Sequence, residues 1–291
     1  MTLPPSPPPR TDILPGTLLH VMAWRMSSPS DFSQMHELCH LRSTLEAFAV
    51  ARLHGCPERG LVLERLSASV RAMERAARRA DYERFHVHDL EFHRILVDNC
   101  KLPALRKSWE IVAAELDDWL QELKKVYWPN LMTLHYEHIL LLEALKSPLH
   151  WVGERAVHQH IEAGWYRIAL SEGETPAGPD AIAKADAFIS THFSSDFDME
   201  FVARHVSFVS PSHFNRLFRK KFGISPYARL RQTRMGHAAE LLQNTDTKIS
   251  ELGSRVGYRN SSHFIKDFRA IYGKTPAQYR RGMTAAASTS T

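Results

Sequence analysis

The last third of the chain contains one residue pattern twice. Residues 201–226 are FVARHVSFVSPSHFNRLFRKKFGISP, and residues 249–276 are ISELGSRVGYRNSSHFIKDFRAIYGKTP. Each copy carries Ser-His-Phe, a second Phe four residues later, and an ending of an aromatic residue, Gly, two variable residues and Pro. Self-similarity of this kind indicates an internal duplication. Both copies are therefore expected to fold alike, as a short helix packed on a second helix through the repeated aromatic residues.

Glycine and proline occupy equivalent positions in the two copies. Gly is favoured just past the end of a helix and Pro in the first turn of the next one. Gly223 and Gly273 are thus expected to end the second helix of each copy, and Pro226 and Pro276 to open the helix that follows. The other matched pairs are His213 with His263, Phe214 with Phe264, Phe218 with Phe268, and Phe222 with Tyr272.

The remainder of the chain shows apolar residues at helical spacing and no alternating pattern typical of strands. We expect an all-α protein with an antiparallel bundle of about six helices over residues 33–170. Residues 180–291 are expected to form a seven-helix module that ends in a short disordered tail. The Pro-rich residues 1–32 predict a flexible tail, and the residues SEGETPAGP at 171–179 predict a linker.

Charge separates the two parts as well. From residue 180 onward there are 17 Lys and Arg against 9 Asp and Glu, a net charge of +8. The preceding residues hold 20 against 23, a net charge of −3, and the two values sum to the +5 of the whole chain. A basic module behind a mildly acidic one favours a polyanionic partner for the C-terminal part.

The second copy resembles the DNA-binding signature of the AraC/XylS family of bacterial transcription regulators, in ISELGSRVGYRNSSHF and in FRAIYGKTPAQYR. The resemblance implies two recognition helices, joined by a long connecting helix, that enter successive major-groove segments of double-stranded DNA. Asn pairs well with adenine and Arg with guanine, so Asn215 and Arg216 are the expected base readers. The implied DNA-binding residues are Ser212, Asn215, Arg216, Arg219 and Lys220 in the first copy, and Asn260, Ser261, Ser262, Ile265 and Lys266 in the second.

A polar pair stands out in the N-terminal part, in VHDLEFHRIL at residues 87–96. Asp89 and His93 are four residues apart and therefore project from one face of a helix. The pair fits a metal site, an acid/base pair or a solvated helix face. His138 and His160, on two further expected helices, complete a set of one carboxylate and three imidazoles that suits a divalent transition metal such as zinc, nickel or manganese.

Three segments of the N-terminal part resemble the FCD domain, the helical effector module of FadR-type GntR regulators. They are LRSTLEAFAVARL, DLEFHRILVDNCKLPAL and EHILLLEALKSPLHWVGERAVHQHI. The family pattern of Asp-x-x-Phe-His, Glu-His and a final His is kept, at Asp89, His93, His138 and His160. The resemblance implies a metal at these residues, a small organic-acid effector beside it, and a homodimer formed through this domain.

Arginine is the expected partner for the effector's carboxylate, because its planar guanidinium binds a carboxylate through two hydrogen bonds. Arg42 is the first candidate and Arg94 the second. An ion pair with Glu46, four residues along the helix, is the alternative role for Arg42. An FCD domain usually follows an N-terminal DNA-binding domain, whereas here the DNA-binding pattern lies at the other end.

Three functions remain open: a transcription regulator that senses a carboxylate, a regulator for which the metal itself is the signal, and a metallohydrolase. Glu137 is the nearest candidate general base. It adjoins the ligand His138 and is expected to point off a different helix face, so we expect no enzymatic activity. The apolar runs fall short of a membrane span, and three cysteines without metal-site spacing suit a reduced cytoplasm. RNA polymerase is a candidate partner.

Overall fold

The computed structural model describes residues 29–171 and 180–288. Within these ranges every regular element is a helix, which confirms the all-α prediction. The chain divides into two compact units, Met1–Ala177 and Gly178–Thr291. Most of the predicted N-terminal tail, nearly all of the predicted linker and the last three residues lie outside the described residues.

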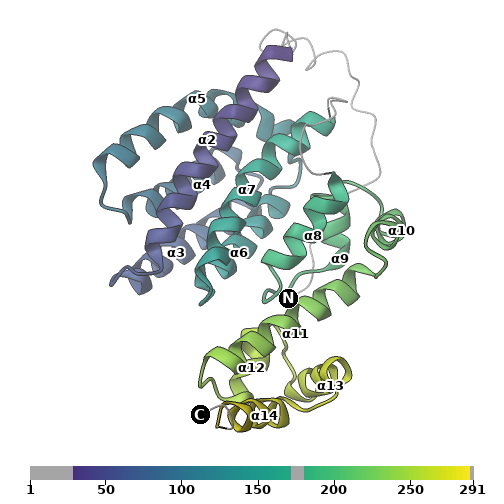
Figure 1. The fold of residues 1–291 in the computed structure, drawn as a ribbon. Coiled ribbons are helices and arrows are strands. Elements are labelled where there is room, and N and C mark those ends of the chain that lie inside the picture. The colour runs from purple at the N-terminus through teal and green to yellow at the C-terminus, as the bar shows by residue number, and fades with distance from the viewer. Residues whose placement is uncertain (1–28, 172–179, 289–291) are drawn as a thin grey trace. The chain divides into compact units, whose positions relative to one another are not determined.

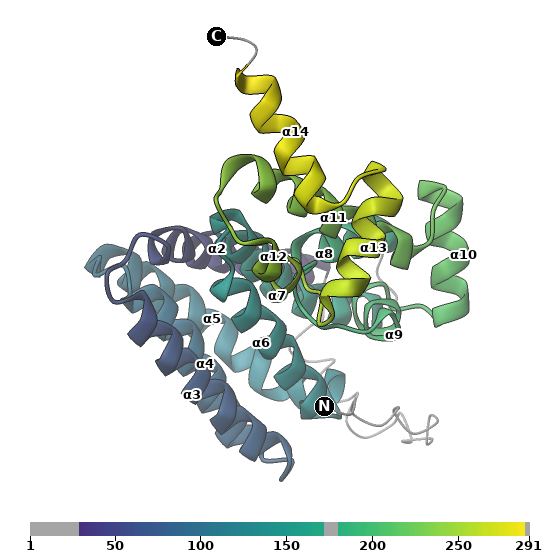
Figure 2. The same cartoon turned by 90° about the horizontal axis from the view of Figure 1, so that it is seen from below.

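The first unit is a bundle of long helices (Figures 1 and 2). Helix α2 packs chiefly against α7, α5 and α4, while α3 packs against α4 and α6. Local sequence signals set several of the ends: Asp81 caps α4, Asn130 caps α6, and Pro103 opens α5. The helices are α2 (Pro29–Leu53), α3 (Arg59–Ala77), α4 (Tyr82–Asp98), α5 (Pro103–Tyr127), α6 (Leu131–Lys146) and α7 (His150–Ser171). The first of them begins four residues before the predicted start of the bundle.

The second unit contains the seven helical segments expected, when α9 and the π-helical turn η1 that continues it are taken together. Helix α8 packs against η1, α10 and α11, whereas α11 also contacts α12, α13 and α14. Helix α11 is thus the long connection between the two copies. The segments are α8 (Ala181–Thr191), α9 (Met199–Phe201), η1 (Val202–Val206), α10 (Pro211–Phe222), α11 (Pro226–Asn244), α12 (Ile249–Arg255), α13 (Ser261–Tyr272) and α14 (Pro276–Ser288).

The duplicated aromatic residues form equivalent cores. Phe218 and Phe268 are fully buried, and their ring centroids lie 4.7 Å from those of Phe222 and Tyr272. Gly223 and Gly273 follow α10 and α13 in the left-handed conformation, with φ of 74° and 71°. A residue with a Cβ is strained there, which explains the glycine at both places. The predicted helix ends are therefore confirmed.

The two copies differ in the turn between their helices. In the first copy a π-helical turn, η1, ends the short helix, and Phe208 adopts a positive φ of 54°. In the second copy the positive φ falls on Gly257, at 85°. A Cβ on Gly257 would lie 2.8 Å from the carbonyl oxygen of Phe193. The second turn therefore requires glycine, whereas the first inserts a wider helical turn and moves the left-handed residue by one position.

None of the described helices is both long enough and apolar enough to cross a bilayer.

Helix α7 approaches its neighbours closely at Gly153. A Cβ at this position would lie 2.9 Å from Val50 Cγ1 and 3.3 Å from Leu145 Cδ2. Val50 is β-branched and cannot turn away easily. We expect Gly153→Ala to lower the free energy of unfolding by about 1–2 kcal/mol, because overpacking outweighs the gain in helix propensity. Urea unfolding followed by circular dichroism measures the change.

Gly164→Ala is the matched control on the same helix. Its Cβ would make an ordinary contact, 3.6 Å from the ring of Trp128. The free energy of unfolding of this variant should equal that of the wild type or exceed it by up to about 1 kcal/mol. Equal effects of the two substitutions would show that the close approach at Gly153 does not limit packing.

Candidate metal centre and DNA-binding surface

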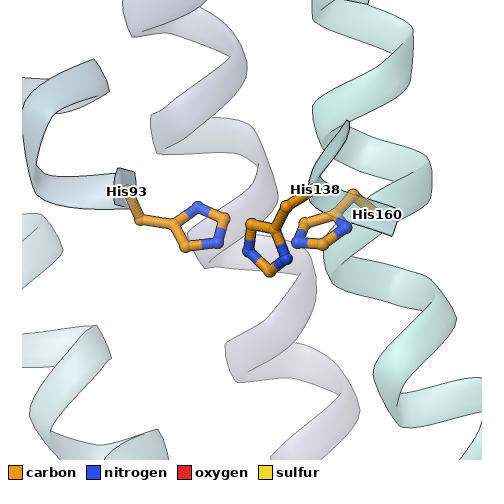
Figure 3. Close-up of side chains that lie close together, drawn as sticks. All are labelled: His93, His138 and His160. Atoms are coloured by element: carbon orange, nitrogen blue, oxygen red, sulfur yellow. The ribbon is translucent and has the colours of Figure 1, made fainter. Parts of the chain in front are cut away.

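Three imidazoles converge inside the first unit. His93 of α4, His138 of α6 and His160 of α7 each offer a ring nitrogen, and these nitrogens all lie within 4.8 Å of one another. Figure 3 shows the three rings arriving from separate helices. His93 and His138 are buried, and His160 is partly buried. The fold thus brings together three of the four residues predicted to bind a metal.

Asp89, the fourth predicted ligand, lies beside them. Its Oδ1 is 2.8 Å from His138 Nε2 and 3.7 Å from His93 Nε2. Its other oxygen, Oδ2, accepts a hydrogen bond from Lys124. Asp89 is therefore placed to offer one oxygen to a cation held by the histidines, while the second oxygen stays on Lys124.

The outer nitrogens of two rings are fixed by protein groups. His138 Nδ1 donates to the carbonyl oxygen of Leu134 at 2.9 Å, and His93 Nδ1 lies 2.6 Å from Glu46 Oε2. His138 Nε2, by contrast, is buried without a hydrogen bond of acceptable geometry. Because Nδ1 carries the proton, this Nε2 presents a lone pair to the Asp89 oxygen, and a cation between the two atoms removes their repulsion. The residues therefore fit a divalent metal.

A cavity of about 60 Å³ opens beside this cluster. That volume holds a few waters. Asp89, His93 and His160 form one wall. The remaining lining residues are Cys39, Arg42, Leu116, Lys124, Trp128, Leu134, Glu137, Ile161, Gly164 and Trp165.

The predicted DNA-binding residues lie on α10 and α13 of the second unit or, for Asn260, just before α13. All ten are exposed, whereas Phe214, Phe218, Phe264 and Phe268 on the same helices are buried. A hollow on α13 is lined by Ser262, Ile265, Lys266, Arg269, Ala270 and Thr275. The structure thus presents the predicted side chains to solvent, as contact with DNA requires.

Asn260 has a second role at the start of α13. Its side-chain oxygen accepts hydrogen bonds from the backbone N–H groups of Ser262 and His263, at 2.8 Å and 3.3 Å. It is therefore the N-cap of α13. Ser210 holds the same position before α10 and accepts from His213.

Comparison with known families agrees with both halves of this description. Residues 37–163 match the FCD domain, and residues 202–282 match a helix-turn-helix domain. The chain combines an FCD domain with an AraC-type helix-turn-helix domain.

Several known proteins are similar to part of the chain. The regulatory protein PocR of Salmonella typhimurium is 34% identical over 49% of this chain and 45% of its own length. The lactose operon transcription activator of Staphylococcus xylosus is 36% identical over 34% of this chain and 35% of its own length. A solved DNA-binding domain of AdpA, in complex with a target DNA, is 30% identical over 37% of this chain and 96% of that chain, with a TM-score of 0.36. The chain spans less than half the length of both curated relatives.

Glu46 holds His93 in place within the FCD domain. It is fully buried and accepts hydrogen bonds from Arg42 Nε at 2.9 Å and from Trp109 Nε1 at 2.8 Å, in addition to its contact with His93. Burial opposes ionisation, but His93 and Arg42 outweigh it and lower the pKa of Glu46 to about 2. The ion pair weighed as the alternative role of Arg42 is therefore present, and the same arginine also lines the cavity.

Burial lowers the pKa of two histidines of the centre. Burial, together with the nearby His138 and His93, holds the pKa of His160 well below its usual range. Burial also lowers the pKa of His93, although Glu46 opposes it. Burial opposes ionisation of Asp89, yet Lys124 and His138 hold its pKa well below the usual range. For His93, His160 and Asp89 these shifts favour the deprotonated states that metal binding needs.

Two predictions about neighbouring residues need correction. Arg94, the second candidate for the effector, is not among the residues that line the cavity; it forms an exposed ion pair with Glu91 because its side chain leaves the opposite side of α4 from Asp89. Glu137 was expected to point away from the centre, whereas it lines the cavity. Its Oε1 accepts a hydrogen bond from Arg167 at 2.6 Å.

Sequence reasoning missed two buried residues beside Asp89. Lys124 of α5 is buried and contacts both Asp89 and His86. His86 is also buried, and its Nε2 lies 2.5 Å from Asp117 Oδ1. His86 precedes Asp89 by three residues and His93 by seven, so the helical repeat alone places all three on one face. For Lys124 no comparable local signal exists.

The contact between Glu46 and His93 gives a test of the centre. We expect Glu46→Gln to lower metal affinity by about 10- to 100-fold, because the imidazole loses the carboxylate that orients it. Competition with a chromophoric zinc chelator measures the affinity. The variant should also be less stable, since Arg42 loses its buried partner. Glu37→Gln, at an exposed position of the same helix, is the matched control. Equal zinc affinities of the two variants would contradict the assigned role.

The exposed residues of α10 give a second test. We expect Arg216→Ala to relax preference at one base position at a cost of about 1–3 kcal/mol, since Arg reads guanine edges. Lys220→Ala should weaken binding to all sequences alike and reduce the salt dependence by about one counterion. Selection from a random DNA pool followed by titration at several salt concentrations separates the two effects. Uniform losses for both variants on selected and scrambled DNA would contradict the assignment of Arg216.

Proposed function

We propose that the protein is a DNA-binding transcription regulator whose FCD domain binds a divalent transition metal and a small carboxylate. The observation that carries this proposal is the convergence of three imidazoles and Asp89 beside a small cavity that Asp89, His93 and His160 line, in a chain that also holds an AraC-type domain. The names of the similar proteins, PocR and the lactose operon transcription activator, support the regulatory half.

The ligand set favours a transition metal over calcium or magnesium. Imidazoles suit zinc and nickel, whereas calcium and magnesium prefer oxygen ligands. A bound cation attracts carboxylates, and the cavity beside Asp89 and His160 adds Arg42 and Lys124 to that attraction. The cavity of about 60 Å³ leaves room beside the candidate ligands for a small acid group.

Regulation requires that the acid bind two states of the protein with different affinity. We place the response in the homodimer expected for FCD domains, from which it reaches the AraC-type domain through residues 171–179. Double-stranded DNA is then the macromolecular partner, and RNA polymerase is a candidate second one.

A screen of small carboxylates by thermal shift tests the proposal. Protein stripped with a chelator and reloaded with zinc, nickel or manganese should melt at a higher temperature than the stripped protein. The loaded protein should gain a further increase with at least one acid, because a ligand stabilises the state that binds it. Asp89→Ala should lose both increases. The absence of any acid-dependent shift, or an equal shift in the variant, would refute carboxylate sensing at this site.

The small size of the cavity favours a second candidate, in which the metal itself is the signal. Titrating metal against DNA affinity, without any acid, distinguishes the two. A change of DNA affinity that follows metal occupancy alone supports the second candidate, and a change that needs the acid supports the first.

A further inference from the structure

Lys124 is a buried cation at the edge of the candidate metal centre. It lies near the end of α5, and only 5% of its surface is exposed. Its ammonium donates to Asp89 Oδ2, and it lies 2.9 Å from His86 Nδ1. Lysine is almost never buried to this extent unless it is paired. The pairing with Asp89 therefore explains how the protein tolerates a buried ammonium. It does not show whether Lys124 also contacts a ligand.

The donor capacity of Lys124 is not used up by these contacts. An ammonium has three N–H donors. Within the described part of the chain, Asp89 and His86 account for two of them. Lys124 also lines the cavity, together with Asp89, His93 and His160. A ligand in the cavity thus meets a lysine donor and the candidate metal ligands on the same wall.

Charge in this region favours an anion. Arg42 and Glu46 are a pair, and so are Arg167 and Glu137, so each pair cancels. Asp89 then faces Lys124 on one oxygen and the candidate metal position on the other. Asp117 pairs with His86 beyond Lys124, so two carboxylates face an ammonium and a divalent cation, and one positive charge is left unbalanced. A small anion beside Lys124 supplies the missing negative charge.

We propose that Lys124 binds the carboxylate of the effector, and that Arg42 instead positions His93 through Glu46. The assignment of Lys124 rests on the proposed function, since it takes the acid and the metal from it. It changes which residue selects the ligand: the charge of Arg42 is balanced by the buried Glu46, whereas Asp89 must serve both Lys124 and the candidate metal position.

The test measures acid and metal binding separately on the full chain. Zinc-loaded wild type and Lys124→Met are titrated with acetate, lactate and malonate by calorimetry, and zinc affinity is measured without acid by chelator competition. We expect Lys124→Met to lose about 10- to 100-fold in affinity for the acid that the wild type binds, because one charge-assisted hydrogen bond disappears. Zinc affinity should stay equal or increase, because a nearby positive charge is removed.

Three further variants complete the design. Lys125→Met removes an exposed lysine next in sequence and should bind acid and zinc like the wild type. Lys124→Arg keeps the charge and should recover part of the acid affinity. Lys124→Gln keeps a hydrogen bond to Asp89 without the charge, and it replaces Lys124→Met if that variant does not fold.

Each outcome decides between the two proposals. If the wild type binds zinc and an acid while the neutral variants bind that acid equally well, Lys124 is not the effector's partner, although the proposed function stands. If the neutral variants lose zinc together with the acid, Lys124 only supports Asp89 and the inference is wrong. If the zinc-loaded wild type binds none of the three acids, carboxylate sensing itself loses its support and the role of Lys124 falls with it.

Discussion

The buried carboxylate of Glu46 is the interaction on which the candidate metal centre depends. It joins Arg42 on its own helix, Trp109 of α5 and His93 of α4 at one point. Removing a carboxylate from water costs several kcal/mol unless its partners are all in place. The same carboxylate therefore fixes how α2, α4 and α5 lie relative to one another and how the His93 ring is oriented. A residue outside the ligand set thus fixes the ligand geometry.

The parts of this site that could be predicted from sequence are those that depend on local spacing. Asp89 and His93 share a face because they are four residues apart, and His86 could have been added by the same rule. Lys124 could not, because its burial depends on contacts with a helix 35 residues away, and nothing local distinguishes it from the exposed Lys125. Glu137 was misplaced for the same reason: side chains as long as Glu reach a cavity from a neighbouring face. The metal and its effector stay predictions.

The duplicated module shows where a repeat in sequence stops being a repeat in structure. The aromatic cores and the glycine helix ends coincide, because each depends on residues shared by both copies. The turns do not, because the second copy has Gly257 where the first has Ser207. Without the glycine, the first turn widens into η1 and leaves Phe208 with a positive φ. Such a residue costs about 1–3 kcal/mol unless its surroundings enforce it. Packing of the surrounding residues therefore maintains the first turn, whereas the glycine at position 257 is enough for the second.

The charged pairs around the cavity give a physical route from a small ligand to helix packing. Lys124 with Asp89 joins α5 to α4, and Arg167 with Glu137 joins α7 to α6. Because both pairs are largely buried, neither member can be left without a partner at little cost. A ligand that takes a hydrogen bond from one member must therefore change the balance between two helices. Ligand affinity and helix arrangement are then linked in both directions, as any coupling between two sites requires. A cavity lined by apolar residues alone would bind a ligand without this consequence for the bundle.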